Sequence, residues 1–185
     1  MFLKALIPFI FFINFFLNVQ ASEKQAIIKH FSEINNFSFN FKQVTQKKTE
    51  TGNCLLEFDN KLKCNYNDSL QKEIIVNDKT LVILQKRYNK MYYYPVSKSP
   101  FINILSKKKL INLIKKSDLE LKDNIQLIYR DENQNKIIVF FDKENYELIG
   151  WLLQDNFQNE IYFSLQIKKI NSKIDKNYFK IPVLD

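Results

Sequence analysis

Two cysteines are the residues in this sequence whose types and spacing most clearly predict a covalent link. Cys54 and Cys64 lie at nearly equal distances from the turn residues Asp59-Asn60, within a stretch of alternating apolar and polar residues, 52–66, that is typical of a β-hairpin. A hairpin can set the two side chains next to each other on neighbouring strands. In an oxidising compartment we expect a disulfide. The alternative is two small buried side chains that do not pair.

Residues that catalyse reactions or bind metals are scarce. The chain of 185 residues contains one histidine, His30, and two glycines. The sequence therefore offers no Ser-His-Asp or Cys-His pair, no site with several histidine ligands and no glycine-rich phosphate loop. Acidic residues such as Asp68 and Asp142 fall in expected turns, where turn propensity accounts for them. We expect no enzyme activity, no metal and no cofactor.

The first 21 residues have the pattern of a signal peptide. Lys4 gives a short positive region, residues 5–17 form an apolar run, and Val19-Gln20-Ala21 fits a cleavage site. Cleavage leaves a single domain, 22–185, which is long enough to bury a core. An uncleaved membrane anchor is the alternative, although the run is short for a membrane span. Export supplies the oxidising compartment that a disulfide requires. The residue directly after the cleavage site is Ser22 and not a cysteine, so we expect no lipid attached there.

The net charge of +8 is carried mainly by lysine. A basic chain can bind nucleic acid, an acidic protein or a membrane surface. The lysines are spread along the expected strands, which favours the solvated outer face of an antiparallel sheet. Export, and a pattern that hides the aromatic side chains, argue against a nucleic-acid platform, so we expect no nucleic-acid partner.

Two amphipathic helical segments are predicted. Ile27, Phe31 and Ile34 follow a capping box at helical spacing, so the first helix runs from Ser22 to about residue 36. Ser99-Pro100 begins the second segment. Phe101, Ile104 and Leu105 supply its apolar side, and after a charged break at 106–109 residues 110–114 continue it. This basic-flanked segment could lie on a membrane, but we favour a helix that closes over a sheet.

Alternation of apolar and polar residues predicts about ten antiparallel strands, joined by turns rich in Asn and Asp. A long antiparallel sheet of this size curls toward a barrel, and two helices could plug its open side. The expected strands are 37–44, the two arms of the 52–66 hairpin, 73–76, 80–84, 91–94, 125–129, 136–141, 146–153, 160–170 and 178–181.

Bulky apolar residues gather on one face of these strands. As a set they indicate either a crowded core or a cavity lined for an apolar ligand. They are Phe37, Phe39, Phe41, Leu62, Tyr66, Tyr92, Tyr94, Trp151, Phe163 and Leu165.

The order of these features resembles the periplasmic outer-membrane lipoprotein carrier family, LolA, over most of the mature chain. An N-terminal amphipathic helix precedes Phe37-x-x-x-Phe41-Lys42-Gln43, which is similar to the F-x-x-x-F-x-Q strand of that family, and Gly52 opens the hairpin. Further matches are Ile74 to Asp78, Tyr92 and Tyr94 followed by Ser99-Pro100-Phe101 and Leu105, Trp151 to Asp155, and the closing Phe179-Lys180-Ile181-Pro182.

The resemblance implies an α+β fold: an incomplete, strongly curved antiparallel β-barrel of about ten or eleven strands with a helical lid. It also implies a periplasmic carrier, expected to be a monomer. Such a carrier takes lipidated lipoproteins from an inner-membrane ABC transporter, shields their acyl chains in a cavity and passes them to an outer-membrane acceptor lipoprotein. A lipid- or lipoprotein-sensing regulatory domain is the alternative function.

On this hypothesis the bulky apolar face of the strands lines an acyl cavity, and the two helices form its lid. The expected acyl cavity comprises Phe37, Phe39, Phe41, Leu62, Tyr66, Tyr92 and Tyr94. The expected lid comprises Ile27, Phe31, Phe101, Ile104 and Leu105.

The hairpin departs from the family pattern. Members commonly carry an Arg-Pro near its turn, and that arginine is thought to hold the lid closed, whereas Phe58-Asp59 stands there in this chain. A hydrophobic position four residues on, important for transfer in the family, falls on Leu62. Lys61 or Lys63 could substitute for the arginine, but the alternation assigns both to the solvated face.

Overall fold

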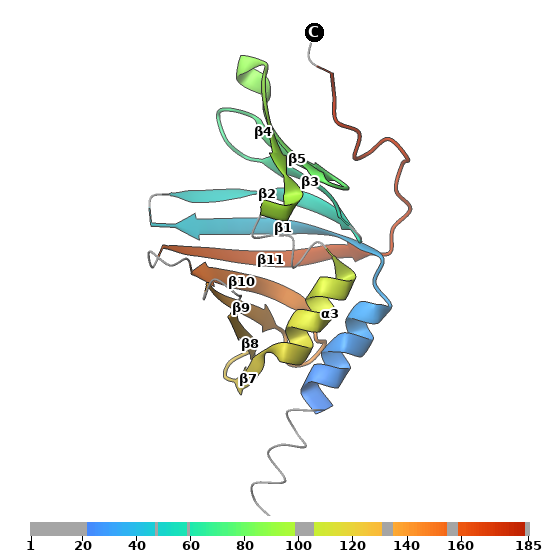
Figure 1. Ribbon diagram of the computed structural model, residues 1–185, viewed down its shortest axis with the longest axis vertical. Coiled ribbons are helices and arrows are strands. Elements are labelled where there is room, and N and C mark those ends of the chain that lie inside the picture. The colour runs from blue at the N-terminus through green and yellow to red at the C-terminus, as the bar shows by residue number, and fades with distance from the viewer. Residues whose placement is uncertain are drawn as a thin grey trace, which may run out of the picture.

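One antiparallel sheet dominates the structure (Figure 1). The computed structural model describes residues 22–46, 48–58, 60–98, 106–130, 135–154 and 159–183. Eleven strands lie in the order β6-β5-β4-β3-β2-β1-β11-β10-β9-β8-β7. Among the described residues the edge strands β6 and β7 do not pair with each other, so the sheet curves without closing. The predicted incomplete barrel is therefore confirmed.

Most strands fall where alternation predicts them. Phe37, Phe39 and Phe41 are buried on one face of β1, while Asn40 and Lys42 are exposed on the other. The strand bounds are β1 Asn36–Thr45, β2 Thr49–Glu57, β3 Lys61–Tyr66, β4 Lys72–Asn77, β5 Thr80–Gln85, β6 Lys90–Pro95, β7 Asp118–Leu121, β8 Ile125–Arg130, β9 Lys136–Phe141, β10 Leu148–Gln154 and β11 Glu160–Ile170.

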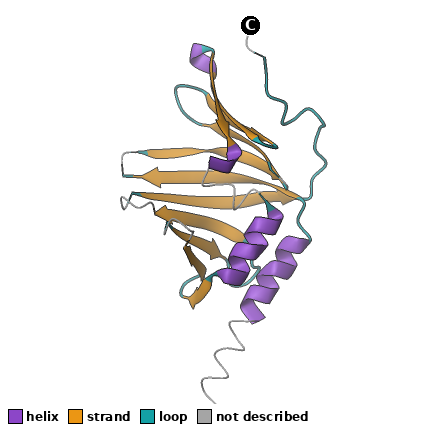
Figure 2. Cartoon of the chain, in the orientation of Figure 1, coloured by secondary structure: helices purple, strands orange, loops and turns teal. Residues whose placement is uncertain are grey.

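Two helices lie side by side over the inner face of β8–β10, as Figures 1 and 2 show. Residues 22–32 form the N-terminal helix. Its Phe31 ring packs edge-on against the Phe141 ring of β9, with the ring centres 5.7 Å apart. The helix α3, Lys107–Lys116, buries Leu110 and its apolar neighbours. The Lys24 ammonium donates a hydrogen bond to the Ser117 carbonyl just beyond α3, so the two helices are joined at this end. Two short 3-10 helices, η1 Lys86–Tyr88 and η2 Val96–Lys98, flank β6.

Three sequence predictions about elements need correction. The helix α3 begins at Lys107, inside the charged break expected at 106–109, because lysine is compatible with a helix interior. The short strand β7 was not predicted, since only Leu119 of its four residues is buried. Residues 178–181 form no strand: a turn covers 176–179.

The segment after β11 instead passes the outer side of β3. The Lys63 ammonium, on the outer side of β3, lies 5.4 Å from the centre of the Tyr178 ring. The neighbouring Phe179 is buried, as are Ile75 and Val82 on the outer side of β4 and β5. The apolar alternation of the Tyr178–Ile181 segment thus reflects packing of the chain end on the sheet, rather than pairing within it.

Two predictions lie outside the described residues. They are the signal peptide, 1–21, and the first part of the second helical segment, which holds Phe101, Ile104 and Leu105.

Candidate functional site

An apolar cavity lies on the inner face of the sheet, between β1–β5 and the adjoining strands β10 and β11. Its volume is about 50 Å³. None of its lining residues comes from the two described helices, which cover the other half of the inner face. The lining residues are Phe39, Cys54, Leu56, Leu62, Cys64, Tyr66, Ile74, Val76, Leu81, Trp151 and Phe163.

Strand register explains why these residues meet. Residues directly opposite each other on paired strands share one face of the sheet. Leu56 pairs with Leu62, Leu62 with Val76, and Val76 with Leu81, so one row of aliphatic side chains crosses four strands. Cys54, Cys64 and Ile74 form the next row by the same rule. The cavity wall is therefore a direct product of the meander from β2 to β5.

A row of aromatic rings borders this aliphatic wall. Trp151 and Phe163 stack with ring centres 4.2 Å apart, and Phe163 stacks on Phe41 at 5.0 Å. Phe41 then meets Tyr66 edge-on at 4.9 Å, across Gly52 of β2. A methyl group on Gly52 would approach the Phe41 ring to 2.7 Å and the Asn65 carbonyl oxygen to 2.1 Å. Glycine is required here because any side chain would clash with the Asn65 backbone and with the Phe41 ring.

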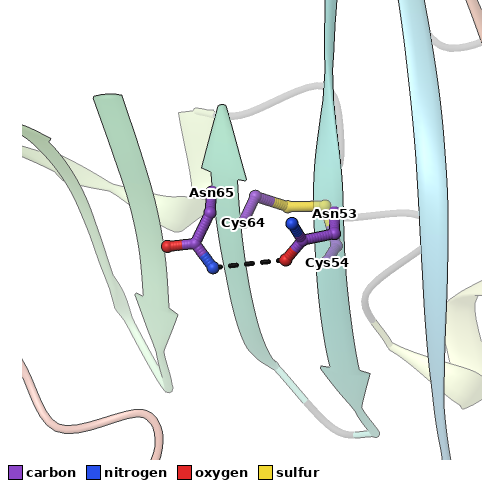
Figure 3. The surroundings of a disulfide bond; sticks show 4 residues. All are labelled: Asn53, Cys54, Cys64 and Asn65. Atoms are coloured by element: carbon purple, nitrogen blue, oxygen red, sulfur yellow. Dashed lines mark hydrogen bonds between the residues drawn. A yellow bond between two sulfur atoms is a disulfide. The ribbon is translucent and has the colours of Figure 1, made fainter. Parts of the chain in front are cut away.

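The disulfide forms part of the cavity wall. Cys54 and Cys64 are register partners on β2 and β3, their Cα atoms are 4.1 Å apart, and their sulfur atoms are bonded. Figure 3 shows the bond on one side of the hairpin, with Asn53 and Asn65 on the adjoining positions. The side-chain amide of Asn65 donates a hydrogen bond to Asn53 at 3.3 Å. The bridge therefore ties the two strands together within the wall of the site.

Removal of the disulfide should destabilise the protein. We expect Cys54→Ala with Cys64→Ala to lower the free energy of unfolding by roughly 2–3 kcal/mol, because the bond closes a short loop in the unfolded chain. Denaturant unfolding of the oxidised protein, the reduced protein and the double variant measures this effect. The reduced protein should fall to a midpoint near that of the variant. Equal midpoints for the oxidised protein and the variant would contradict the prediction.

Charged residues gather at the Tyr66 end of the cavity. Lys72 donates to the Glu50 carboxylate at 2.5 Å and Lys48 donates to it at 2.9 Å. Burial opposes ionisation of Glu50, but these two hydrogen bonds and charges outweigh it and hold the pKa of Glu50 below its ordinary value. The Lys72 ammonium also lies 3.7 Å from the centre of the Tyr66 ring. Burial, followed by the charges of Glu50 and Asp68, raises the pKa of Tyr66, so its phenol stays neutral.

Lys72 should give the stability of this end a pH dependence. Since the pKa of Glu50 is lowered on folding, the stabilisation is present above the unfolded value of 4.5 and is lost as pH falls through the lower folded value. We expect Lys72→Met to lower the free energy of unfolding by about 1–2 kcal/mol at neutral pH, because it removes a partner from a partly buried carboxylate.

Urea unfolding at neutral pH and below pH 4.5 tests this. The difference between the wild type and Lys72→Met should shrink in acid. Lys48→Met is the matched control, because the Lys48 side chain is 59% exposed and an exposed pair contributes little. A loss in Lys72→Met that is equally large at both pH values would refute the assigned cause.

The predicted cavity residues occupy different places on the inner face. Phe39, Leu62 and Tyr66 line the cavity, and Phe41 supports it from the aromatic row. Phe37 lies farther along β1, where its ring contacts those of Phe39 and Phe58.

Tyr92 and Tyr94 are not among the lining residues. They pair with Ile83 and Leu81, which places them on the inner face, yet they are 41% and 48% exposed because β6 is an edge strand. They extend the apolar face beyond the cavity.

The predicted lid residues Ile27 and Phe31 are fully buried over the other half of the sheet, in the same apolar core as the cavity residues.

Lys61 and Lys63 face outward, as expected, and pair with Glu57 and Glu73. The contact between α3 and the hairpin comes from Lys107. Its ammonium lies 5.6 Å from the centre of the Phe58 ring and donates to the Ser32 carbonyl at 3.2 Å.

Sequence reasoning missed four aliphatic lining residues: Leu56, Ile74, Val76 and Leu81. Leu56 and Leu55 are adjacent apolar residues, as are Ile74, Ile75 and Val76, so alternation alone does not say which of them faces inward. The strand register fixed by the disulfide shows which of them faces inward. Once Cys54 and Cys64 are paired, every second residue of β2 and β3, and the β4 residues opposite those of β3, must share their face.

Two kinds of site were not found in the part of the chain that the structure describes. No group of three or more His, Cys, Asp or Glu side chains is placed to hold a metal ion there. No helix within the same ranges has the length and apolar character to cross a membrane.

Known proteins resemble this chain in sequence pattern and in fold. The family model described as "Outer membrane lipoprotein carrier protein LolA" matches residues 32–182. An uncharacterized conserved protein from Thermus thermophilus has a TM-score of 0.56 and 8% identity, over 89% of this chain and 94% of that chain. A DUF1329 family protein from Desulfovibrio piger ATCC 29098 has a TM-score of 0.52 and 8% identity, over 89% and 98%.

A LolA superfamily protein from Nitrosomonas europaea is also similar, with a TM-score of 0.45 and 10% identity over 84% of this chain and 97% of that chain. No curated protein matches the sequence. The two higher TM-scores show that the chain shares its fold with those structures.

Proposed function

Because this chain belongs to the outer membrane lipoprotein carrier protein LolA family, we propose that it carries lipidated lipoproteins by shielding their acyl chains in the apolar cavity. The observation that carries this proposal is the cavity on the inner face of the sheet, whose lining is aliphatic or aromatic apart from the disulfide, the Tyr66 hydroxyl and the Trp151 indole N–H. Such a lining can exclude water from an acyl chain, and it offers no charged group to an ionic ligand.

Magnitudes explain why such a carrier is needed. Each buried methylene contributes about 0.8 kcal/mol, so one long acyl chain favours a membrane over water by about 10 kcal/mol. A lipoprotein therefore does not cross an aqueous compartment unaided. We place this protein in the periplasm as an exported monomer. It would accept cargo from an inner-membrane ABC transporter and deliver it to an outer-membrane acceptor lipoprotein.

Release requires the site to bind acyl chains less tightly than the acceptor does. The cavity suits this requirement, since its volume of about 50 Å³ is well below the ~300 Å³ at which ligand pockets usually begin. An acyl chain must push neighbouring groups apart, and their reclosure favours release. The exposed inner-face residues Tyr92 and Tyr94 would offer the displaced chain a further apolar surface.

The proposal is tested by mass spectrometry of material bound to protein purified from the periplasm, followed by transfer to acceptor-containing membranes. We expect triacylated lipoproteins to copurify and to move to the acceptor. Copurification with a membrane-bound regulator, without transfer, would instead support the sensing function. Protein that carries no lipidated molecule would overturn both.

A further inference from the structure

The exposed side of α3 is a strip of positive charge. Leu110, Leu113 and Ile114 of this helix are buried against the sheet. Lys108, Lys109, Asn112, Lys115 and Lys116 are exposed. At about 100° per residue, these five exposed positions fall within an arc of roughly 120°. The helix therefore has an apolar side that is covered by the sheet, with Ile111 partly exposed at its edge, and a polar side that carries four lysines.

These four lysines, 108, 109, 115 and 116, have little opposing charge nearby; we call them the lysine strip. None of them forms an ion pair with another described residue. Asp118 is exposed just beyond the helix, and Glu120 pairs with Lys122 at 2.7 Å. The adjacent N-terminal helix carries Glu23, Lys24 and Lys29, and Glu33 follows directly after it, so these four charges balance. The strip thus keeps a net positive charge.

The residue type indicates what kind of surface the strip fits. Lysine is a flexible, strongly hydrated point charge, unlike arginine, whose planar group selects particular carboxylate geometries. The strip also spreads its charge along one side of a single helix, over residues 108–116, rather than concentrating it at one point. Such a surface suits a broad plane of negative charge, which needs no shape complementarity. Bilayers that contain anionic phospholipids present such a plane.

We propose that the lysine strip of α3 docks this protein on the surface of an anionic phospholipid bilayer. Docking is electrostatic, because the apolar side of α3 is occupied by the sheet and cannot insert. Since α3 lies over the inner face of the sheet, docking turns that face toward the bilayer (Figure 1). Docking of this kind depends only on the charge and exposure of the lysine strip, and it does not require the cavity to bind a lipoprotein.

Cosedimentation with vesicles tests the proposal. Protein purified from the periplasm is mixed with vesicles of phosphatidylcholine and phosphatidylglycerol, or of phosphatidylcholine alone. We expect binding to the anionic vesicles only, and loss of binding at about 1 M salt, where the Debye length is about 3 Å. Changing the four lysines to glutamine should weaken binding by roughly 100- to 600-fold, since each lysine near the surface contributes up to a factor of about five.

The matched control changes Lys168, Lys169, Lys173 and Lys176 to glutamine, which removes the same charge from exposed positions on β11 and the segment after it. It should bind within about threefold of the wild type, an effect of lost net charge alone. Leu62→Glu, which targets the cavity, should bind vesicles normally, so failure of the carrier function can be distinguished from failure of docking. Absence of wild-type binding, equal binding to phosphatidylcholine, or an equal loss in the control would overturn the proposal.

Discussion

Leu62→Glu is expected to reduce acyl-chain binding by at least about 100-fold while the sheet remains folded. Leu62 lies in the aliphatic row of the cavity between Leu56 and Val76. When an acyl chain fills the cavity, a carboxylate at this position would lose its hydration and would have no partner charge to replace it. An unpaired buried charge costs several kcal/mol. In the empty protein the cost is smaller because Leu62 is only partly buried and the new side chain can turn to water.

Displacement of a fluorescent fatty acid measures this loss, and circular dichroism with thermal unfolding reports on the fold. Leu121→Glu is the matched control: it makes the same change on β7, where Leu121 is 48% exposed and does not line the cavity. It should bind like the wild type. Leu62→Met, which keeps the apolar volume, should also bind. Retained binding in a folded Leu62→Glu protein would show that the cavity is not the acyl site.

Local pattern predicts the strands of this protein better than it predicts their neighbours. The alternation of Phe37, Phe39 and Phe41 suffices to predict β1 and its buried face. The contact of Phe41 with Phe163 depends on pairing between β1 and β11, which are more than a hundred residues apart in sequence. Long-range register is decided by the whole core, so the aromatic row could not be derived from any one segment.

The edges of the sheet limited the prediction of the site in a different way. Tyr92 and Tyr94 alternate with Tyr93, yet all three are exposed because β6 is an edge strand. A tyrosine satisfies both a half-buried and an exposed position, so its type does not distinguish a cavity wall from a rim. Likewise, amphipathic spacing predicts that Ile27 and Phe31 are buried. It does not predict that they cover β9 rather than the cavity.

Trp151→Ala is expected to cause the largest loss of stability among these variants, about 3–5 kcal/mol, and a ligand should recover part of it. Trp151 is buried, stacks on Phe163 at 4.2 Å and lines the cavity. Its removal loses transfer free energy and leaves a void. An apolar void stays dry and accepts apolar ligands. In the variant, a bound acyl chain should fill this void and regain contacts with its walls. In the wild type, the cavity of about 50 Å³ must first open before an acyl chain can make such contacts.

Denaturant unfolding with and without a saturating fatty acid tests this linkage, because a ligand that binds only the folded state raises the free energy of unfolding according to its affinity. The increase should be larger in Trp151→Ala than in the wild type. Phe179→Ala is the matched control, since Phe179 is also a buried aromatic residue but does not line the cavity. It should lose stability without gaining a larger response to the ligand. If all three proteins respond equally, acyl chains do not occupy the space beside Trp151. The cavity would then be only a packing defect of the core.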